Sequence, residues 1–520
     1  MPSPLGEGGP AGPDEGRVYG SVPVKRHKAR PPLISPLRGQ LPPKGKPFIS
    51  PRIARGLFLW YTQPERVRCF EKLKKERLFT NRQLLTLLWP LIIEQALEIL
   101  VGMADTVMVS SVGEAAISGV SLVDMINQLI ITLFGALATG GAVVTSQHLG
   151  AKRREEAAHS AGQLVTLSAI LGVGVAAFCL ITRTAQLRLF FGTITDDVMQ
   201  ACLTYFTITA LSFPFLALYN AGAAIFRSTG NSAVSMKVSV IVNAINFCGN
   251  ALCVFVLKMG VAGVAVPTLI SRAVGAVIIL SLAARPDYVL QITPRSVTRL
   301  EGKTVKSILY IGVPSAFENS LFQLGRVLVV SMISLFGTVH ISANAVANNL
   351  DAIGCIVGNA MGLAMITVVG RCVGAQDFEQ TKYYTKKLLL WDYIAQGAVN
   401  VTVLLLLNEI LSMYTLTPET RALAFTLVMI HNGFSILLWP ASFVLPNALR
   451  AANDVRYTMV VATISMLVWR MGLSWVLCVN MGMGAVGVWY AMLVDWVCRV
   501  ICFVARFATG AWKKNAVKKV

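Results

Sequence analysis

Charged side chains are scarce in this sequence, and acidic ones are the scarcer kind. Only 14% of the 520 residues are charged, and 26 Asp and Glu stand against 46 Lys and Arg. Soluble domains carry about 25% charged residues. Because 55% of the residues are hydrophobic and the mean hydropathy is positive, the composition excludes an ordinary soluble protein and predicts a polytopic membrane protein.

The spacings that mark several kinds of functional site are also absent. The ten cysteines include no Cys-x-x-Cys pair and most lie within apolar runs, so we expect small buried side chains rather than disulfides or metal ligands. The five histidines show no metal-ligand spacing, and no Ser/His or phosphate-loop constellation is present. We therefore predict neither an enzyme nor a bound cofactor or metal.

The formal net charge of +20 raises the question of nucleic-acid binding, but no nucleic-acid-binding motif accompanies it. Much of the charge lies in short loops and near the N-terminus, as expected for the cytoplasmic segments of a membrane protein. Residues 1–79 are rich in Pro, Gly and basic side chains, which predicts a disordered cytoplasmic extension. Within it, residues 65–77 form a basic amphipathic segment suited to anionic headgroups. The apolar patch at 56–61 is too short for a signal peptide.

Twelve apolar segments follow, each close to or above the length of about 20 residues that spans a bilayer. The first is expected to begin with a capping box at Thr80 to Gln83. The segments lie near residues 84–110, 118–145, 160–182, 199–225, 234–257, 261–284, 305–333, 341–368, 386–408, 420–446, 458–478 and 484–507. Basic loops alternate with loops of few charges, which predicts that both termini are cytoplasmic.

This pattern predicts an all-α, multi-pass protein of the cell (plasma or inner) membrane. Its partners would be the lipid bilayer and small molecules, with no nucleic acid. The predicted parts are an N-terminal six-helix lobe at 80–284, a cytoplasmic linker at 285–304, a C-terminal six-helix lobe at 305–508 and a basic cytoplasmic tail at 509–520.

The first predicted helix carries three carboxyl groups where lipid would tolerate none. A rotation of about 100° per residue places Glu94, Glu98 and Asp105 on one face. Such a stripe should face a water-filled cavity or another helix, and it predicts ion or substrate handling. Asp105 is the strongest candidate, because one carboxylate can take either a proton or another cation, and the two then compete for it. The alternative is a neutral Asp105 that is hydrogen-bonded between helices.

The chain contains an internal duplication. Pro90 and Glu94 recur 224 residues later as Pro314 and Glu318. The same interval relates Leu97 to Leu321, Gly113 to Gly337 and Gly150 to Gly374. Six helices separate the copies, so they are parallel repeats about an axis along the membrane normal. The twin acids either belong to a moving, proline-bent element or form a symmetric clasp in which each acid bonds a neighbouring helix of its own lobe.

Further polar residues are also candidates, with Asn246 and Asn250 in the first tier beside Asp105 and with Glu98, Asp124 and Asp351 in a second tier. Asp124 in the second helix and Asp351 in the eighth could line the cleft or serve as polar helix ends. Asn246 and Asn250 share one helix face, where amides bind a carboxylate, water or substrate, or join helices. Glu98 shares the face of Asp105 but is replaced by a phenylalanine in the second copy.

Three intramembrane arginines need separate interpretations. Arg499 follows Asp495 by four residues, which predicts an intrahelical ion pair. Arg326 lies on the helix of Glu318 and is expected to help keep the acids of that lobe ionised. Arg272 has no acid within one helical turn, and the sequence indicates no role for it.

Several short motifs occur in the membrane-spanning part of the chain, some of them at matched positions in the two halves. They are Met103 to Met108 leading to Gly113, Gln147 to Ala151, the loops Arg227 to Asn231 and Arg450 to Asp454, Asn246 with Asn250, and the Gly-x-x-Gly turns at 260–263 and 484–487. With these motifs the chain resembles the multidrug and toxic compound extrusion (MATE) transporters over about residues 80–508.

The resemblance implies a V-shaped pair of six-helix bundles that alternates between inward and outward openings. It implies a monomeric antiporter that exports organic, often cationic, drugs or metabolites in exchange for H+ or Na+. Asp105 falls on the family's coupling aspartate, and Asn246 and Asn250 fall on positions that line the same pocket. Some members carry an aspartate where this chain has Asn250.

Other functions remain as alternatives. A lipid-linked oligosaccharide flippase of the same superfamily would have the same membrane plan, but it should show a basic cavity for pyrophosphate, whereas the intramembrane charge here is mainly acidic. A channel is disfavoured because no symmetric charged filter is present.

Overall fold

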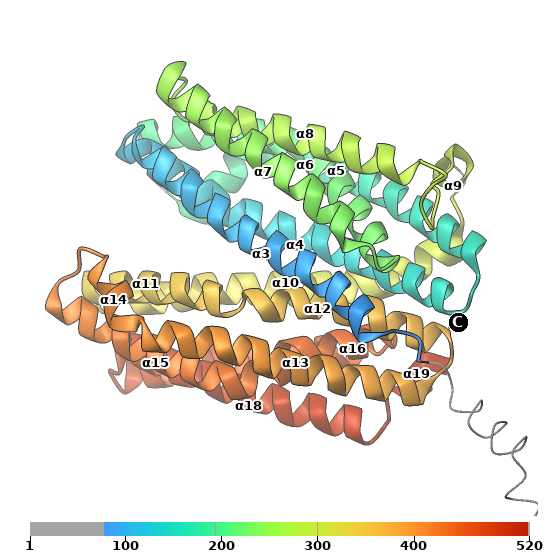
Figure 1. Cartoon of the computed structure of the whole chain (residues 1–520). Helices are drawn as coiled ribbons and strands as arrows, with labels where there is room; N and C mark the ends of the chain where they lie inside the picture. Colours follow the sequence, from blue (N-terminus) through green and yellow to red (C-terminus); the bar gives the residue numbers. More distant parts are fainter. Residues whose placement is uncertain (1–76, 193, 299, 518–520) are drawn as a thin grey trace, which may run out of the picture. The chain divides into compact units, whose positions relative to one another are not determined.

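The computed structural model describes residues 77–192, 194–298 and 300–517, and every regular element in these ranges is helical. In Figure 1 the helices of the N-terminal half (blue to green) lie on one side and those of the C-terminal half (yellow to red) on the other. The predicted N-terminal extension, with its amphipathic segment, lies almost wholly outside the described residues.

Six spans of the described chain form the N-terminal lobe. They are α3 (Asn81–Ser110), α4 (Glu114–Gly150), α5 (Arg154–Phe191), α6 (Asp196–Ser228), α7 (Ser232–Ala251) continued by η1 (Leu252–Val256), and α8 (Ala262–Ala283). α3 begins with the predicted capping box, which is confirmed. The Gln83 amide donates to Thr80 Oγ1 at 3.3 Å, and the Thr80 amide donates to Gln83 Oε1 at 2.9 Å. This reciprocal cap satisfies two backbone donors that a helix start otherwise leaves unpaired.

The C-terminal lobe repeats this order with more interruptions. After the linker helix α9 (Pro294–Thr298), its spans are α10 (Gly302–Ser334), α11 (Thr338–Gly354) with α12 (Ile356–Gly374), α13 (Phe378–Leu405), α15 (Pro418–Trp439) with η2 (Pro440–Val444) and α16 (Leu445–Ala451), α17 (Val455–Ser465) with η3 (Met466–Leu473) and η4 (Val476–Asn480), and α18 (Gly484–Ala508). Two short helices, α14 (Leu407–Ser412) and α19 (Lys513–Val517), lie between and after these spans.

Eleven spans among the described residues are long and apolar enough to cross a membrane. The twelfth, α10, is not one of these eleven, although it has 33 residues. It carries Lys303, Lys306, Glu318 and Arg326, and it packs along α4 of the other lobe. With α10 the described chain contains the predicted six-plus-six arrangement.

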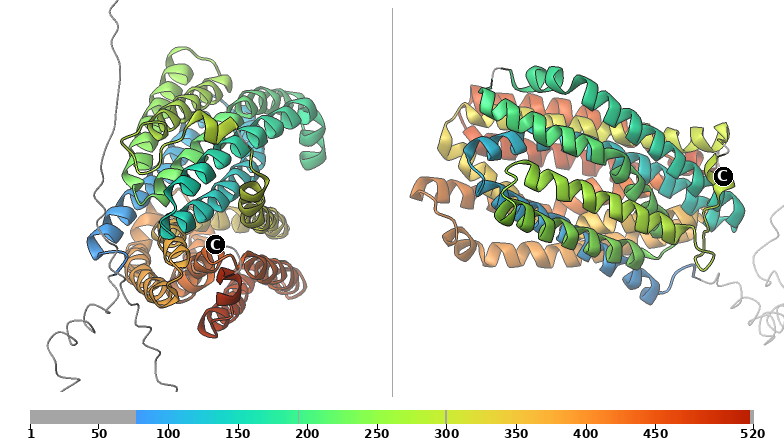
Figure 2. Two further views of the ribbon diagram at one scale, coloured as in Figure 1. Left: turned by 90° about the vertical axis from the view of Figure 1, so that its right-hand side faces the viewer. Right: turned by 90° about the horizontal axis from the view of Figure 1, so that it is seen from above.

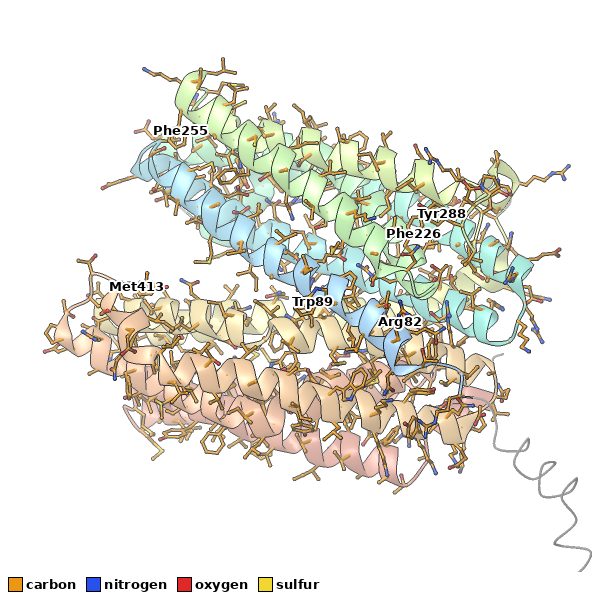
Figure 3. The ribbon with its side chains drawn as sticks, viewed as in Figure 1. Arg82, Trp89, Phe226, Phe255, Tyr288 and Met413 are labelled. Carbon is orange, nitrogen blue, oxygen red and sulfur yellow. The ribbon has the colours of Figure 1, made fainter. Side chains whose placement is uncertain are left out.

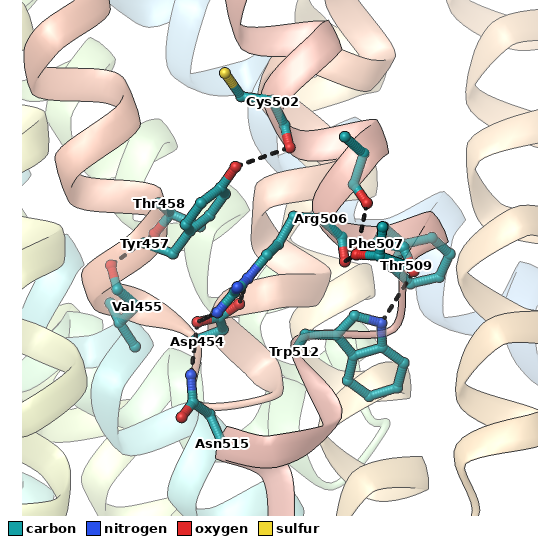
Figure 4. A network of polar contacts seen from close by, with 11 residues as sticks. Asp454, Val455, Tyr457, Thr458, Cys502, Arg506, Phe507, Thr509, Trp512 and Asn515 are labelled. Atoms are coloured by element: carbon teal, nitrogen blue, oxygen red, sulfur yellow. Dashed lines mark hydrogen bonds and ion pairs between the residues drawn. The ribbon is translucent and has the colours of Figure 1, made fainter.

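The C-terminal segment is docked onto its lobe (Figure 4). Asp454 accepts hydrogen bonds from Arg506 Nε at 2.8 Å and from Asn515 Nδ2 at 2.8 Å. The Trp512 side chain is buried, and its Nε1 donates to the Phe507 carbonyl at 3.2 Å. The described part of the predicted tail therefore packs against the start of α17 and the end of α18.

The linker is likewise fastened to the N-terminal lobe. Its Tyr288 meets Phe226, near the end of α6, edge to face with ring centroids 5.1 Å apart (Figure 3). Gln163 Nε2 on α5 donates to the Ser296 carbonyl in α9 at 3.0 Å. These contacts hold the connection between the halves against one end of the first lobe.

The two lobes meet where α4 packs along α10 and α12 and where α3 packs on α12 (Figure 2). A Cβ on Gly150 would overlap the carbonyl oxygen of Arg371. A Cβ on Gly374 would likewise overlap the carbonyl oxygen of Gln147. The two contacts are equivalent under the interval of 224 residues, so each copy of the repeat uses the same glycine to bring two backbones together.

Side chains next to these glycines bond across the lobes. Gln147 Nε2 donates to the Ala451 carbonyl at 2.8 Å, and Arg371 Nη2 donates to the Ser228 carbonyl at 3.0 Å. Each acceptor directly follows the arginine that closes the fourth span of the opposite lobe. The lobes are thus joined at the end where α3 begins and α19 lies (Figure 1).

Replacing Gly150 by Leu is expected to lower the apparent Tm of the purified protein by several degrees. The added side chain overlaps a backbone carbonyl that cannot move away alone, and overpacking costs about 1–3 kcal/mol. Gly135→Leu on the same helix is the matched control, because nothing lies within 4 Å of a Cβ there. Thermal unfolding followed by intrinsic fluorescence measures both variants, and equal losses of Tm would contradict the importance of the inter-lobe contact.

Candidate functional site

A cavity of about 350 Å³ lies inside the N-terminal lobe, enclosed by α3, α4, α6, α7 and α8. We call it the N-lobe cavity. The polar side chains that line it and bear on its chemistry are Glu98, Asp105, Asp124, Asn127, Asn246 and Arg272. The structure therefore brings together Asp105, Glu98, Asp124 and Asn246 from the set of predicted site residues.

Asp105 lies at the wall of this cavity and is only partly buried. Its Oδ1 accepts a hydrogen bond from Asn250 Nδ2 at 2.7 Å. Asn250 also donates to Asn246 Oδ1 at 3.3 Å, and Asn246 Nδ2 donates to Thr268 Oγ1 at 2.9 Å. A chain of hydrogen bonds thus links α3 to α7 and α8. The second oxygen of Asp105 has no partner among the described residues and is available to a ligand.

The structure gives Arg272 a location that the sequence did not indicate. It lines the N-lobe cavity together with Asp105 and Asp124, and its Nη1 donates to Ser212 Oγ at 2.7 Å. Asp124 accepts hydrogen bonds at 3.1 Å from both Asn127 Nδ2 and Tyr205 OH. Because the acids near Arg272 come from α3 and α4, a search along its own helix could not find them.

Among the described residues, the lining of the N-lobe cavity holds three carboxyl groups and one guanidinium. With all four groups ionised, its net charge is negative. A cavity of this sign attracts cations and disfavours anions.

The twin acids Glu94 and Glu318 each form an ion pair inside their own lobe. Arg227 Nη1 lies 3.2 Å from Glu94 Oε1, and Ser235 Oγ donates to Glu94 Oε2 at 3.0 Å. Arg450 Nη2 lies 2.6 Å from Glu318 Oε1. Both pairs join the first and the fourth span of a lobe. This geometry favours the clasp interpretation over the moving element, and Glu94 does not line the N-lobe cavity.

The C-terminal lobe holds a cavity of about 420 Å³, which we call the C-lobe cavity. Asp351 lies in its wall, where His431 Nε2 is 2.7 Å from Asp351 Oδ1 and Cys355 Sγ donates to the same oxygen at 3.2 Å. Arg326 and Arg470 line the same cavity. The possible ligand atoms of Asp351, Cys355 and His431 lie within 4.8 Å of one another. They bond each other, however, and two guanidinium groups in the same cavity oppose a divalent cation.

Two other features concern acids of the C-terminal lobe. Arg499 Nε lies 2.9 Å from Asp495 Oδ1, which confirms the predicted intrahelical pair.

Asp392 was not identified from the sequence. It is fully buried on α13, and neither carboxylate oxygen has a hydrogen-bond partner among the described residues. Gln396 and Asn400 follow it at intervals of four, so a polar stripe in an otherwise apolar helix was the available signal.

A family model described as MatE matches residues 90–252 and 314–476, one segment in each lobe and together more than half of the chain. The chain belongs to the MatE family. The two matched segments of this MATE protein are offset by the same interval of 224 residues that relates the twin acids. The predicted resemblance and the predicted duplication are thereby confirmed together.

Relatives of this MATE protein cover most of its length. The uncharacterized transporter YisQ of Bacillus subtilis is 27% identical over 439 residues, which is 82% of this chain and 94% of YisQ. The probable multidrug resistance protein NorM of Thermotoga maritima is 24% identical over 445 residues, which is 84% of this chain and 94% of NorM. Both alignments therefore cover the two lobes.

Solved structures confirm the fold. An outward-facing multidrug resistance MATE family transporter of the MOP superfamily superposes with a TM-score of 0.78 at 20% identity, covering 83% of this chain and 96% of that one. A MATE protein in complex with MaD3S superposes with a TM-score of 0.77 at 21% identity. The predicted fold, an all-α multi-pass membrane protein of two parallel six-helix bundles, is thus confirmed.

Proposed function

We propose that this MATE protein is a secondary antiporter that exports organic, often cationic, drugs or metabolites in exchange for protons or Na+. The observation that carries the proposal is the N-lobe cavity, in which Asp105 presents an unpaired carboxylate oxygen within a mainly acidic lining. The names of relatives such as the probable multidrug resistance protein NorM support the same substrate class. The protein would act as a monomer in the plasma or inner membrane, with both termini cytoplasmic and without a cofactor.

Asp105 supplies the exchange step of this mechanism. When ionised, the carboxylate accepts the Asn250 hydrogen bond and attracts an organic cation into the cavity. A proton or Na+ that neutralises the carboxylate removes this attraction, so the coupling ion and the organic cation compete for the same carboxylate. A protonated carboxyl also becomes a donor, which changes its bond to Asn250 and, through Asn246, the connection to α8.

Alternating access requires that the lobes separate at the end where they are now joined. The bonds of Gln147 and Arg371 to opposite-lobe carbonyls are the contacts to be broken there. The neutral Gln147 bond typically contributes about 0.5–1.5 kcal/mol, whereas the charged Arg371 guanidinium donates through both Nε and Nη2 and hydrogen bonds of charged groups contribute about 1.5–3 kcal/mol. Such contacts can hold one state and yet be released on binding of a ligand that favours the other state.

The flippase alternative is less consistent with the N-lobe cavity. A pyrophosphate-linked substrate needs cationic side chains around it, whereas carboxyl groups outnumber the guanidinium in this cavity among the described residues. We therefore favour export of organic cations as the function of this lobe.

Proteoliposomes that contain the full chain test the proposal directly. Ethidium movement should depend on an imposed proton gradient or on an imposed Na+ gradient, applied separately, and should stop when an ionophore dissipates that gradient. Protein-free liposomes provide the background rate. Ethidium movement at the background rate under both gradients would refute export of this substrate class.

A further inference from the structure

The two lobe cavities occupy equivalent places in the internal repeat. More than half of the residues that line the N-lobe cavity have their equivalents, 224 positions later, in the lining of the C-lobe cavity. Examples are Glu98 with Phe322, Asp124 with Asn348, and Asn246 with Arg470. The same pocket has therefore been built twice, and differences between its two linings can be compared position by position.

The charge of the lining is reversed between the copies. The acids Glu98, Asp105 and Asp124 are replaced by Phe322, Val329 and Asn348, while the uncharged Gly102 and Asn246 are replaced by Arg326 and Arg470. Two changes run the other way: Asp351 occupies the position of Asn127, and Trp496 that of Arg272. The balance of these changes makes the second cavity basic where the first is acidic.

The one acid in this lining, among the described residues, is already occupied. The Asp351 carboxylate is bonded by His431 Nε2 at 2.7 Å and by Cys355 Sγ at 3.2 Å. Arg326 and Arg470 have no ion pair and no hydrogen-bond partner in the described chain, and Arg470 Nε is buried. A buried charged donor without an acceptor is unfavourable, so the Arg470 guanidinium can donate hydrogen bonds to an anion that enters the cavity. Arg326, which is exposed and lines the same cavity, is accessible to that anion. Guanidinium groups bind carboxylate and sulfonate oxygens through paired hydrogen bonds.

The remaining wall of the C-lobe cavity is aromatic. Trp439, Trp489 and Trp496 line it together with Phe322 and Phe443. Trp439 stacks on Phe443 with ring centroids 5.1 Å apart. Trp489 is held in place by the hydrogen bond from its Nε1 to Asn344 Oδ1 at 3.0 Å. Rigid, flat faces of this kind favour planar ring systems over flexible chains.

We propose that the C-lobe cavity binds aromatic organic anions, with Arg326 and Arg470 holding the carboxylate or sulfonate and the tryptophans enclosing the ring. The inference rests on the proposed function only in treating both cavities as solute sites. It extends the substrate class from cations, which the N-lobe cavity attracts, to anions taken by the other lobe.

Equilibrium binding to the purified full chain in phosphatidylcholine nanodiscs tests the proposal. Isothermal calorimetry with naphthalene-2-sulfonate is expected to show binding that weakens at least about tenfold in Arg470→Gln and in Arg326→Gln, as expected for the loss of a charge-assisted hydrogen bond. Arg188→Gln, which removes the same charge from an exposed position on α5, is the matched control and should bind as the parent protein does.

Two further measurements separate the possible outcomes. Binding of the cation naphthalen-2-ylmethylammonium should be unchanged in Arg470→Gln, which shows that the variant is folded, and should weaken in Asp105→Asn. Loss of cation binding alone would count against the proposed function and leave the anion site intact. Sulfonate binding that is indifferent to both arginine variants would overturn the anion site. So would displacement by inorganic pyrophosphate that is as effective as displacement by the aromatic sulfonate, because the site would then select phosphate and not the ring.

Discussion

Asp105→Asn is expected to reduce gradient-driven export to the background of protein-free vesicles while the protein remains folded and inserted. Asparagine has nearly the same shape, and its side-chain oxygen can still accept the 2.7 Å hydrogen bond from Asn250. What the variant loses is the ability to change charge. An amide neither binds a proton at physiological pH nor attracts a cation as a carboxylate does, so the competition between the coupling ion and the organic cation disappears.

The control for this experiment is Asp197→Asn, which neutralises an exposed acid in the first turn of α6. Ethidium movement in proteoliposomes and thermal unfolding of the same preparations should be measured together. Transport at the parent rate by Asp105→Asn would support the alternative in which the side chain is only an inter-helical hydrogen-bond partner. Loss of transport together with a large loss of Tm would show a folding defect instead.

Glu318→Ala is expected to cause the largest loss of stability. The side chains of Glu318 and Arg450 are 9% and 12% exposed, and their nearest oxygen and nitrogen lie 2.6 Å apart. Removing the carboxylate leaves Arg450 as an uncompensated, nearly buried charge, and breaking a buried pair costs about 3–5 kcal/mol. Thermal unfolding of the purified variant should show a marked fall in Tm, whereas Glu409→Ala, at an exposed position on α14, should change it little.

A double-mutant cycle separates the clasp from the moving element. Glu318→Gln and Arg450→Gln should each destabilise the protein, and the double variant should be less destabilised than the sum of the two, because neither charge is then left alone. If Glu318→Gln instead retains the parent Tm and loses transport, the acid moves ions and the clasp interpretation fails. The equivalent pair Glu94 and Arg227 should behave in the same way.

The three acids of the first helix show what helical periodicity in the sequence can and cannot predict. Helical geometry correctly indicates that Glu94, Glu98 and Asp105 cannot face lipid, but the structure divides them: Glu94 pairs with Arg227, while Glu98 and Asp105 line the N-lobe cavity. A helical repeat specifies the direction in which a side chain points and not the neighbour that it meets. The partner of Glu94 is 133 residues away in the chain, and no local pattern encodes that contact.

By itself, the sequence determined the number and order of the spans, the duplication and the presence of intramembrane acids, because hydrophobic runs, exact intervals and charged residues are visible along one dimension. Only the tertiary structure decided which charges share a cavity. The residues that line each cavity come from at least five helices, so the sign of the net charge in the cavity depends on residues that only the fold brings together. The fold places Arg272 beside acids of α3 and α4, and it places Arg326 and Arg470 in the same C-lobe cavity.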